Sequence, residues 1–171
     1  GVAPSVDPRG SLSRPVIYSL FRRLVGRDSA RSVYAREHLR VQPGQRVLDL
    51  GCGTAEVLQF LPQVDYVGYD VSERYIERAR KRFGRRGVFH CAAVDDSLDM
   101  GAAGYDIVLA HGVLHHLDDR TARALFRLAR RALKAGGRLV TLDGCFVEGQ
   151  SAVARLFLSL DRGRHVRARA A

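Results

Sequence analysis

The residues best suited to chemistry form one short stretch, Val-Leu-Asp-Leu-Gly-Cys-Gly-Thr at positions 47–54. It begins with the composition of a β-strand and continues through a Gly-x-Gly turn into a segment of helical character. A strand that runs into a glycine turn and a helix N-terminus is a nucleotide-binding unit. Gly51 and Gly53 allow a tight turn and the close approach of a ligand, because they lack a Cβ atom. Asp70 ends the next apolar run, about 20 residues further on, where a ribose-binding carboxylate is expected.

Glu56 bears on which nucleotide this loop binds. A pyrophosphate cofactor such as NAD requires a third glycine at position 56, and a carboxylate there would lie close to two phosphate charges. S-adenosylmethionine (SAM) has no phosphate and carries a positive sulfonium and a positive ammonium group. Several acids are expected along one edge of the sheet: Asp49, Glu56, Asp70, Asp95 and Asp96. This charge pattern favours SAM over a dinucleotide.

Four blocks of the sequence resemble those of class I SAM-dependent methyltransferases, in family order and with family-like spacing. They are residues 47–54, Tyr-Asp-Val-Ser at 69–72, Tyr-Asp-Ile-Val-Leu at 105–109 with Gly-Val-Leu-His-His-Leu at 112–117, and Leu-Lys-Ala-Gly-Gly-Arg-Leu-Val at 133–140. The resemblance covers roughly residues 44–144. It implies an α/β fold with a doubly wound, mainly parallel, Rossmann-like sheet in strand order 3-2-1-4-5. It also implies SAM as the cofactor and S-adenosylhomocysteine as the product.

The resemblance also assigns residues to the cofactor. The expected set is Asp49, Gly51, Cys52, Gly53, Asp70, Val71, Asp95, Asp96 and His111. Asp49 would orient the methionine amino group, directly or through the loop; the alternative is a solvated acid at a strand end. Asp70 would accept hydrogen bonds from both ribose hydroxyls, with Val71 against the adenine ring. The alternative for Asp70 is a cap at the approach to the next helix.

Two departures from the family pattern bear on SAM affinity. Ala55 replaces the family's third glycine, and its methyl group would crowd the methionine end of the ligand. Ala93 replaces the acid that often follows the third strand, so Asp95 or Asp96 is expected to contact the adenine amino group. Alternatively, these two acids cap the turn before residue 104.

Three histidines follow the predicted fourth strand, at the end of the sheet where chemistry is expected. A neutral histidine there would take a proton from a hydroxyl or amine nucleophile. His111 is the first candidate for this catalytic role because it lies nearest the strand end. The alternative, which the resemblance favours for His115 and His116, is a structural or capping role. No neighbouring cysteine or carboxylate completes a metal spacing, so no metal site is predicted.

The elements that position these residues alternate between strands and helices, which predicts a parallel sheet with right-handed crossovers. The strands are expected at 46–50, 64–70, 87–91, 104–110 and 138–143. The helices are expected at 15–25, 29–40, 54–62, 72–83 and from Asp118 or Asp119 to a stop at Gly136-Gly137. Ser29 and Ser72 are the expected N-caps of the second and fourth of these helices. In the fourth helix, Tyr75, Ile76, Ala79 and Phe83 share one apolar face.

The chain is expected to be one domain with four parts. Residues 1–13 form a flexible arm, 14–43 the N-terminal helices, 44–144 the SAM-binding core, and 145–171 a helix with a basic tail. The N-terminal helices would form a lid, with Tyr18, Phe21 or Tyr34 over the sulfonium. The alternative, which is favoured for these three aromatic residues, is packing in the core. No sequence is found for the family's last two strands, so a truncated or minimal form is expected. The fifth strand is then an open edge, which predicts a homodimer through it.

The composition of the chain limits the cellular location and the partners that are expected for it. The 171 residues include no run approaching the roughly 20 apolar residues of a membrane span, and no signal peptide is visible. The cysteines at 52, 91 and 145 are read as buried thiols in a reducing cytoplasm. The net charge of +10 is nearly all arginine. A nucleic-acid surface is one interpretation, but coding bias and solvated helix faces are favoured because the arginines are scattered in the sequence.

The function expected is methyl transfer from SAM by in-line displacement. The acceptor is expected to be the oxygen, nitrogen or carbon of a small molecule, because no Asn/Asp-Pro-Pro-aromatic block and no Pro-Cys pair is present. Two alternatives stay open. One is a non-catalytic binding or scaffold module with the SAM fold, and the other is an RNA methyltransferase that uses the arginine-rich surface.

Overall fold

The computed structural model of this protein describes residues 27–100 and 104–143, and the chain forms two compact units, residues 1–40 and 41–171. In the first unit, α2 spans Arg27–Tyr34 and continues into a π-helical turn at Ala35–Leu39. Ser29 lies inside α2, so its predicted role as the N-cap is wrong. Three predicted segments fall outside the described residues: the arm at 1–13, the helix at 15–25 with Tyr18 and Phe21, and the segment 145–171.

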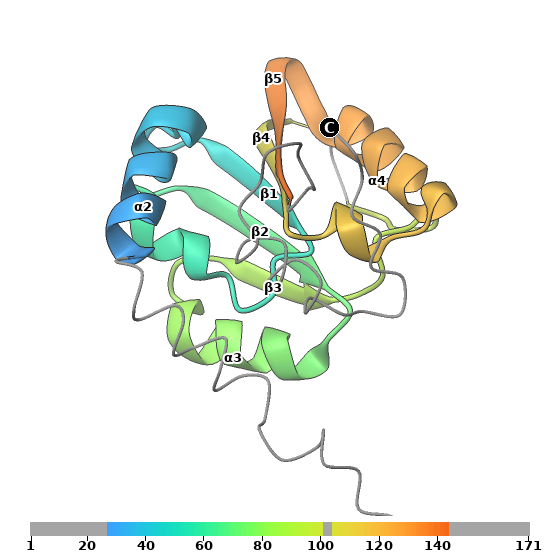
Figure 1. The fold of residues 1–171 in the computed structure, drawn as a ribbon, viewed down its shortest axis with the longest axis horizontal. Helices are drawn as coiled ribbons and strands as arrows, with labels where there is room; N and C mark the ends of the chain where they lie inside the picture. The colour runs from blue at the N-terminus through green and yellow to red at the C-terminus, as the bar shows by residue number, and fades with distance from the viewer. Residues whose placement is uncertain (1–26, 101–103, 144–171) are drawn as a thin grey trace, which may run out of the picture. The chain divides into compact units, whose positions relative to one another are not determined.

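The second unit is built on a five-stranded sheet in which every neighbouring pair of strands is parallel (Figure 1). The strands are β1 (Arg46–Leu50), β2 (Asp65–Asp70), β3 (Val88–Cys91), β4 (Tyr105–His111) and β5 (Leu133–Leu142). Their order is β3-β2-β1-β4-β5. The predicted fold class and strand order are therefore confirmed.

Two capped helices pack on this sheet. α3 (Glu73–Phe83) contacts β2 and β3, and α4 (Asp119–Ala132) contacts β4 and β5 (Figure 1). Ser72 Oγ accepts from the backbone N–H of Tyr75, and Asp118 Oδ1 accepts from that of Thr121. The predicted cap at Ser72 is thus confirmed, and Asp118, one of the two residues at which α4 was expected to start, is the N-cap of α4. On α3 the predicted apolar face is confirmed except for Tyr75, which is exposed.

The core on the α4 side joins residues that are distant in the sequence. Leu48 and Leu50 of β1 and Val108 of β4 pack against Leu125 and Ala129 of α4. The loop after β3 adds its partly buried apolar side chains to the same cluster: Val94, Leu98 and Met100. Each fully buried leucine stabilises the fold by about 2 kcal/mol, so this cluster fixes β1 and β4, the two strands that carry Asp49 and His111.

The segment after β1 differs from the prediction. Instead of an α-helix at 54–62, a single 3₁₀-helix, η2, spans Glu56–Phe60. Ala55 before it is left-handed, and Leu61 after it is extended, as is usual for a residue that precedes proline. The Arg86 guanidinium donates to the carbonyls of Leu58, Leu61 and Pro62 and so satisfies the end of this short helix.

The end of α4 also differs from the prediction. The helix stops at Ala132, before Gly136-Gly137, because Leu133 turns extended and already pairs with Tyr105. The ladder then shifts register, and Ile107 pairs with Arg138. The two glycines therefore lie in an irregular part of β5 and do not end the helix.

Candidate functional site

Asp49, near the end of β1, is a buried carboxylate with one oxygen left without a hydrogen-bond partner among the described residues. The residue is only 3% exposed, and its Oδ2 accepts from the Tyr66 hydroxyl at 2.7 Å. The oxygen without a partner in this part of the chain is Oδ1. The pKa of Asp49 is raised to about 7, mainly by burial; the Tyr66 hydrogen bond opposes this shift, and the nearby charge of Asp70 adds to it. A cation beside Oδ1 would favour the charged form.

The glycine loop follows directly and is tied to β2. The backbone N–H groups of Gly51 and Cys52 both donate to the Tyr69 carbonyl, at 2.8 and 2.9 Å. Gly51 and Gly53 have φ angles of 82° and 55°, a region that side chains disfavour. A Cβ on Gly51 would lie 2.7 Å from Val113, whereas one on Gly53 would meet nothing within 4 Å. The backbone at Gly53 therefore leaves room for a ligand.

Ala55 occupies a position where glycine would be unstrained. It is left-handed at φ 54°, and its methyl group is buried. For an L-residue this conformation costs roughly 1–2 kcal/mol. The departure from the family pattern is thus visible as local strain next to the loop.

Asp70, the last residue of β2, holds the loop from the other side. Its Oδ2 accepts from the Gly53 N–H at 2.9 Å and its Oδ1 from the Ser72 N–H at 2.8 Å. Each carboxylate oxygen can accept a second hydrogen bond, so capacity for ribose hydroxyls remains. Val71 is 71% exposed and leaves an apolar surface beside Asp70.

Cys52 is a structural thiol by its surroundings. A Cβ on Gly68 would lie 2.8 Å from its Sγ, so the thiol fills space over β2. Burial, and then the carboxylates of Asp49 and Asp70, raise its pKa well above the usual range. The thiol is therefore protonated at neutral pH and unsuited to nucleophilic chemistry.

Asp95 and Asp96, the predicted adenine contacts, are engaged elsewhere in this structure. Asp95 Oδ1 accepts from the backbone N–H and the hydroxyl of Ser97. Both oxygens of Asp96 bind the guanidinium of Arg127 on α4. The alternative for Asp95, capping of a turn, matches this geometry, and an adenine contact by either acid stays a prediction.

Histidines and one acid converge at the ends of β4 and β5. His111 is half-buried, and burial lowers its pKa to about 4 despite the opposing effect of Asp143. Its imidazole is therefore neutral at pH 7, and a pKa this low makes it a weaker base than an exposed histidine. His115 is buried, and its Nδ1 lies 2.7 Å from Asp143 Oδ1, which also accepts from the His115 backbone N–H. The rings of His115 and His116 are 4.0 Å apart.

Asp143 is a site residue that the sequence motifs did not predict. Its Oδ2 is buried and has no hydrogen-bond partner within the described ranges. The signal that points to it is its place directly after β5, since parallel strands bring their carboxyl ends to one edge. The rule that singled out the acids at the ends of β1 and β2, Asp49 and Asp70, applies equally to the acid after β5.

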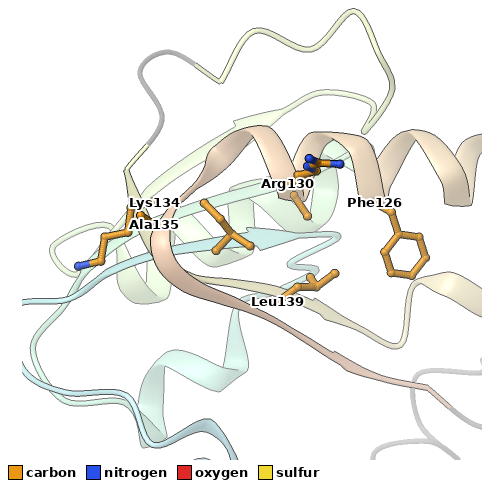
Figure 2. A pocket seen from close by; sticks show the side chains of 7 residues that line it. Phe126, Arg130, Lys134, Ala135 and Leu139 are labelled. Atoms are coloured by element: carbon orange, nitrogen blue, oxygen red, sulfur yellow. The ribbon is translucent and has the colours of Figure 1, made fainter.

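A groove of about 400 Å³ lies away from this edge. The end of α4 and the first half of β5 form it, with Phe126 and Leu139 on its walls (Figure 2). Because β5 begins here, the groove lies toward the amino ends of the strands and does not belong to the loop site.

Within the described residues, no cluster of three metal-binding side chains occurs, and no helix is long and apolar enough to span a bilayer.

Comparison with known proteins agrees with this geometry. The family described as "Methyltransferase domain" matches residues 48–139. The chain is 30% identical to an uncharacterized methyltransferase of Synechocystis over 78% of its own length and 65% of the relative's. It is 35% identical to the 27-O-demethylrifamycin SV methyltransferase of Amycolatopsis mediterranei, over 61% of this chain and 40% of that relative. It is 36% identical to the human probable tRNA methyltransferase 9B, over 61% of this chain and 23% of that relative.

A solved structure supports the fold. The SAM-dependent methyltransferase of Geobacter sulfurreducens, crystallised with S-adenosylhomocysteine, superimposes with a TM-score of 0.56 at 22% identity, over 74% of this chain and 53% of that one. The chain spans less than two thirds of the length of the curated relatives named above. With the matched family covering more than half of the 171 residues, the chain belongs to the methyltransferase-domain family, and its fold is the Rossmann-like class I fold that the sequence motifs predicted.

Proposed function

We propose that this chain is the catalytic core of a SAM-dependent methyltransferase. The observation that carries the proposal is the Asp49 carboxylate, buried beside the glycine loop with its Oδ1 unpartnered among the described residues. An uncompensated buried carboxylate is costly, and a cationic ligand at the loop would remove that cost. The loop also leads into a five-residue 3₁₀-helix in place of a long α-helix, so it offers a pyrophosphate little of the usual helix dipole.

The residues around the loop fit the parts of SAM. Asp49 would hold the ammonium group, the open backbone at Gly53 would lie along the ligand, and Asp70 would accept from the ribose hydroxyls. The exposed Val71 would pack against adenine. Asp95 or Asp96 would reach the adenine amino group only by giving up part of its present contact with Ser97 or Arg127.

The acceptor would lie at the ends of β4 and β5. When bound, SAM supplies a methyl group on a positive sulfur, which an acceptor atom attacks in line. His111, neutral at pH 7, would take the proton from an attacking hydroxyl or amine. Asp143 would hold His115 in a fixed orientation through Nδ1 and keep the wall of this site rigid. A small molecule with an oxygen, nitrogen or carbon nucleophile is the acceptor we favour.

Titration calorimetry with SAM and S-adenosylhomocysteine tests the cofactor assignment. Asp70→Asn should weaken both ligands strongly, because an amide cannot accept from Gly53, Ser72 and the ribose together. Asp65→Asn is the matched control, since Asp65 lies at the other end of β2 and pairs with Arg46. Failure of the wild type to bind either ligand, or equal affinities in the two variants, would refute the proposal.

Two other functions predict different results. A scaffold module would bind SAM and its product but transfer no labelled methyl group to small-molecule or RNA pools. An RNA methyltransferase would label RNA. The similarity to a protein named as a tRNA methyltransferase is an observation in support of this RNA-methyltransferase alternative, as is the net charge of +10.

A cytoplasmic location stays a prediction.

A further inference from the structure

The exposed side of α4 gathers cations that look scattered in the sequence. The helix contains five arginines and a single acid, Asp119. The cations on its exposed side are Arg120, Arg123, Arg127, Arg130 and Arg131, followed by Lys134 at the start of β5. Spacings of three and four residues place them on one face of the helix. From Arg120 to Arg131 this basic face is about 16 Å long at 1.5 Å per residue.

Two of these six cations form a direct ion pair with another described residue. Arg127 is paired with Asp96, and Lys134 with Asp106. No hydrogen bond or ion pair of Arg123, Arg130 or Arg131 occurs in the described part of the chain. The segment 144–171 carries five arginines and two acids, so its composition does not offer a counter-charge either.

α3 provides an internal comparison. Its exposed cations, including Arg74, Arg78 and Lys81, are interspersed with Glu73 and Glu77, the pattern of an ordinary solvated helix. α4 has no such alternation. The basic face is therefore a property of α4 and not of every helix in this arginine-rich chain.

An aromatic ring and the groove adjoin the basic face. Phe126 is 46% exposed, and it lines the groove between α4 and β5 together with Leu139 and Arg130, while Lys134 lines the opposite end of the groove (Figure 2). Guanidinium groups bind phosphates through paired hydrogen bonds, and nucleic-acid bases stack on exposed aromatic rings. A membrane-binding helix would instead present a broad apolar face, whereas the apolar side of α4 is buried against the sheet.

We propose that the basic face of α4 binds the phosphate backbone of a nucleic acid, with a base stacked on Phe126 beside the groove. The face begins one turn after the histidines of the acceptor site, since α4 starts at Asp119 and His116 precedes it by three residues. This inference goes beyond the proposed function, because binding along α4 does not require that the nucleic acid accept the methyl group.

Fluorescence anisotropy with a labelled, unstructured single-stranded RNA tests the proposal. The triple variant Arg123→Gln, Arg130→Gln, Arg131→Gln should lower the slope of log affinity against log salt by about 2, and weaken binding on the order of 100-fold at 0.1 M salt. The control triple Arg74→Gln, Arg78→Gln, Lys81→Gln removes the same charge from α3 and should weaken binding far less. Equal losses in the two triples, or no salt-dependent binding by the wild type, would overturn the proposal.

Substitution of Phe126 distinguishes the binding of a nucleic acid from the binding of any polyanion. Phe126→Leu keeps the groove apolar but removes the stacking surface, so RNA binding should weaken about 5- to 100-fold while binding of heparin is unchanged. Equal effects on both probes would contradict the proposal. So would binding to phosphatidylserine vesicles in the absence of RNA binding. Calorimetry with SAM on the same variants reports on the proposed function separately, because none of these residues contacts the loop site.

Discussion

At the scale of single residues, Asp49 is where fold stability and ligand binding compete. Its carboxyl is buried with a pKa of about 7, against 3.8 for an exposed aspartate. Asp49→Asn keeps an acceptor for the Tyr66 hydroxyl and removes the charge. We expect the variant to lose most SAM affinity and to gain stability relative to wild type at alkaline pH, as measured by urea unfolding and calorimetry.

The sign of the pH dependence follows from the direction of the shift. Between about pH 4 and 7 the folded state retains the Asp49 proton that the unfolded state has lost, so stability falls as pH rises. The advantage of Asp49→Asn should therefore grow by about 2–3 kcal/mol between pH 5 and pH 8. His111, with its pKa lowered to about 4, has the opposite effect below pH 6.5, but it contributes equally to both proteins. A constant difference between them would show that Asp49 is not the titrating group.

The variant Ala55→Gly tests the backbone strain next to the glycine loop. Ala55→Gly relieves the left-handed conformation but loses a buried methyl group and adds flexibility to the unfolded chain, terms of about 1 kcal/mol each. We expect unfolding free energy to change by less than about 1 kcal/mol, and SAM affinity to rise several-fold as crowding is removed. Ala92→Gly is a control outside the loop. Unchanged SAM affinity in Ala55→Gly would mean that the methyl group does not face the ligand.

At the scale of elements, the irregular start of β5 depends on two adjacent glycines with different constraints. Gly136 has φ 77°, and a Cβ there would meet no atom within 4 Å, so Gly136→Ala adds backbone strain alone, roughly 1 kcal/mol. A Cβ on Gly137 would lie 2.9 Å from the Tyr105 carbonyl oxygen and 3.1 Å from that of Asp106. Gly137→Ala should therefore destabilise the fold further, by about 1–3 kcal/mol, because backbone must move. Thermal unfolding of the two variants would refute this if Gly136→Ala were the less stable.

The sequence pattern was sufficient for the elements whose signals are local. Apolar runs that end in acids located β1 and β2, and hydroxyl or carboxyl caps located the starts of α3 and α4. It failed where tertiary contacts decide the backbone. The Arg86 contacts that end η2 join residues more than 20 positions apart, and the early end of α4 depends on pairing of Leu133 with Tyr105.

In the candidate site, too, the features with local sequence signals were predictable and those that depend on tertiary contacts were not. The strand rule placed Asp49, Asp70 and His111 at one edge, because parallel strands end together. The sequence could not reveal that Arg127 binds Asp96 or that Asp143 binds His115, since each pair joins segments about 30 residues apart. Nor could spacing alone show the basic face, because the arginines of α3 and α4 look alike until their acidic neighbours are considered.

At the scale of the whole molecule, the net charge of +10 influences every association of this chain. Opposite charges attract more weakly as salt increases, and like charges repel more weakly. Nucleic-acid binding by the basic face should therefore weaken with salt, whereas self-association should strengthen. Salt dependence distinguishes these two kinds of complex without knowledge of either interface.

The predicted homodimer through β5 can be tested in this way. β5 is one of the two terminal strands of the described sheet, and its far edge has no strand partner among the described residues. Backbone pairing of two such edges is insensitive to salt, but two chains of charge +10 repel each other, over a distance that shrinks from about 10 Å at 0.1 M to about 3 Å at 1 M salt. Sedimentation velocity should therefore show a dimer fraction that rises with both protein concentration and salt. A single monomeric species at high concentration and high salt would rule out pairing through this edge and leave β5 covered by other means.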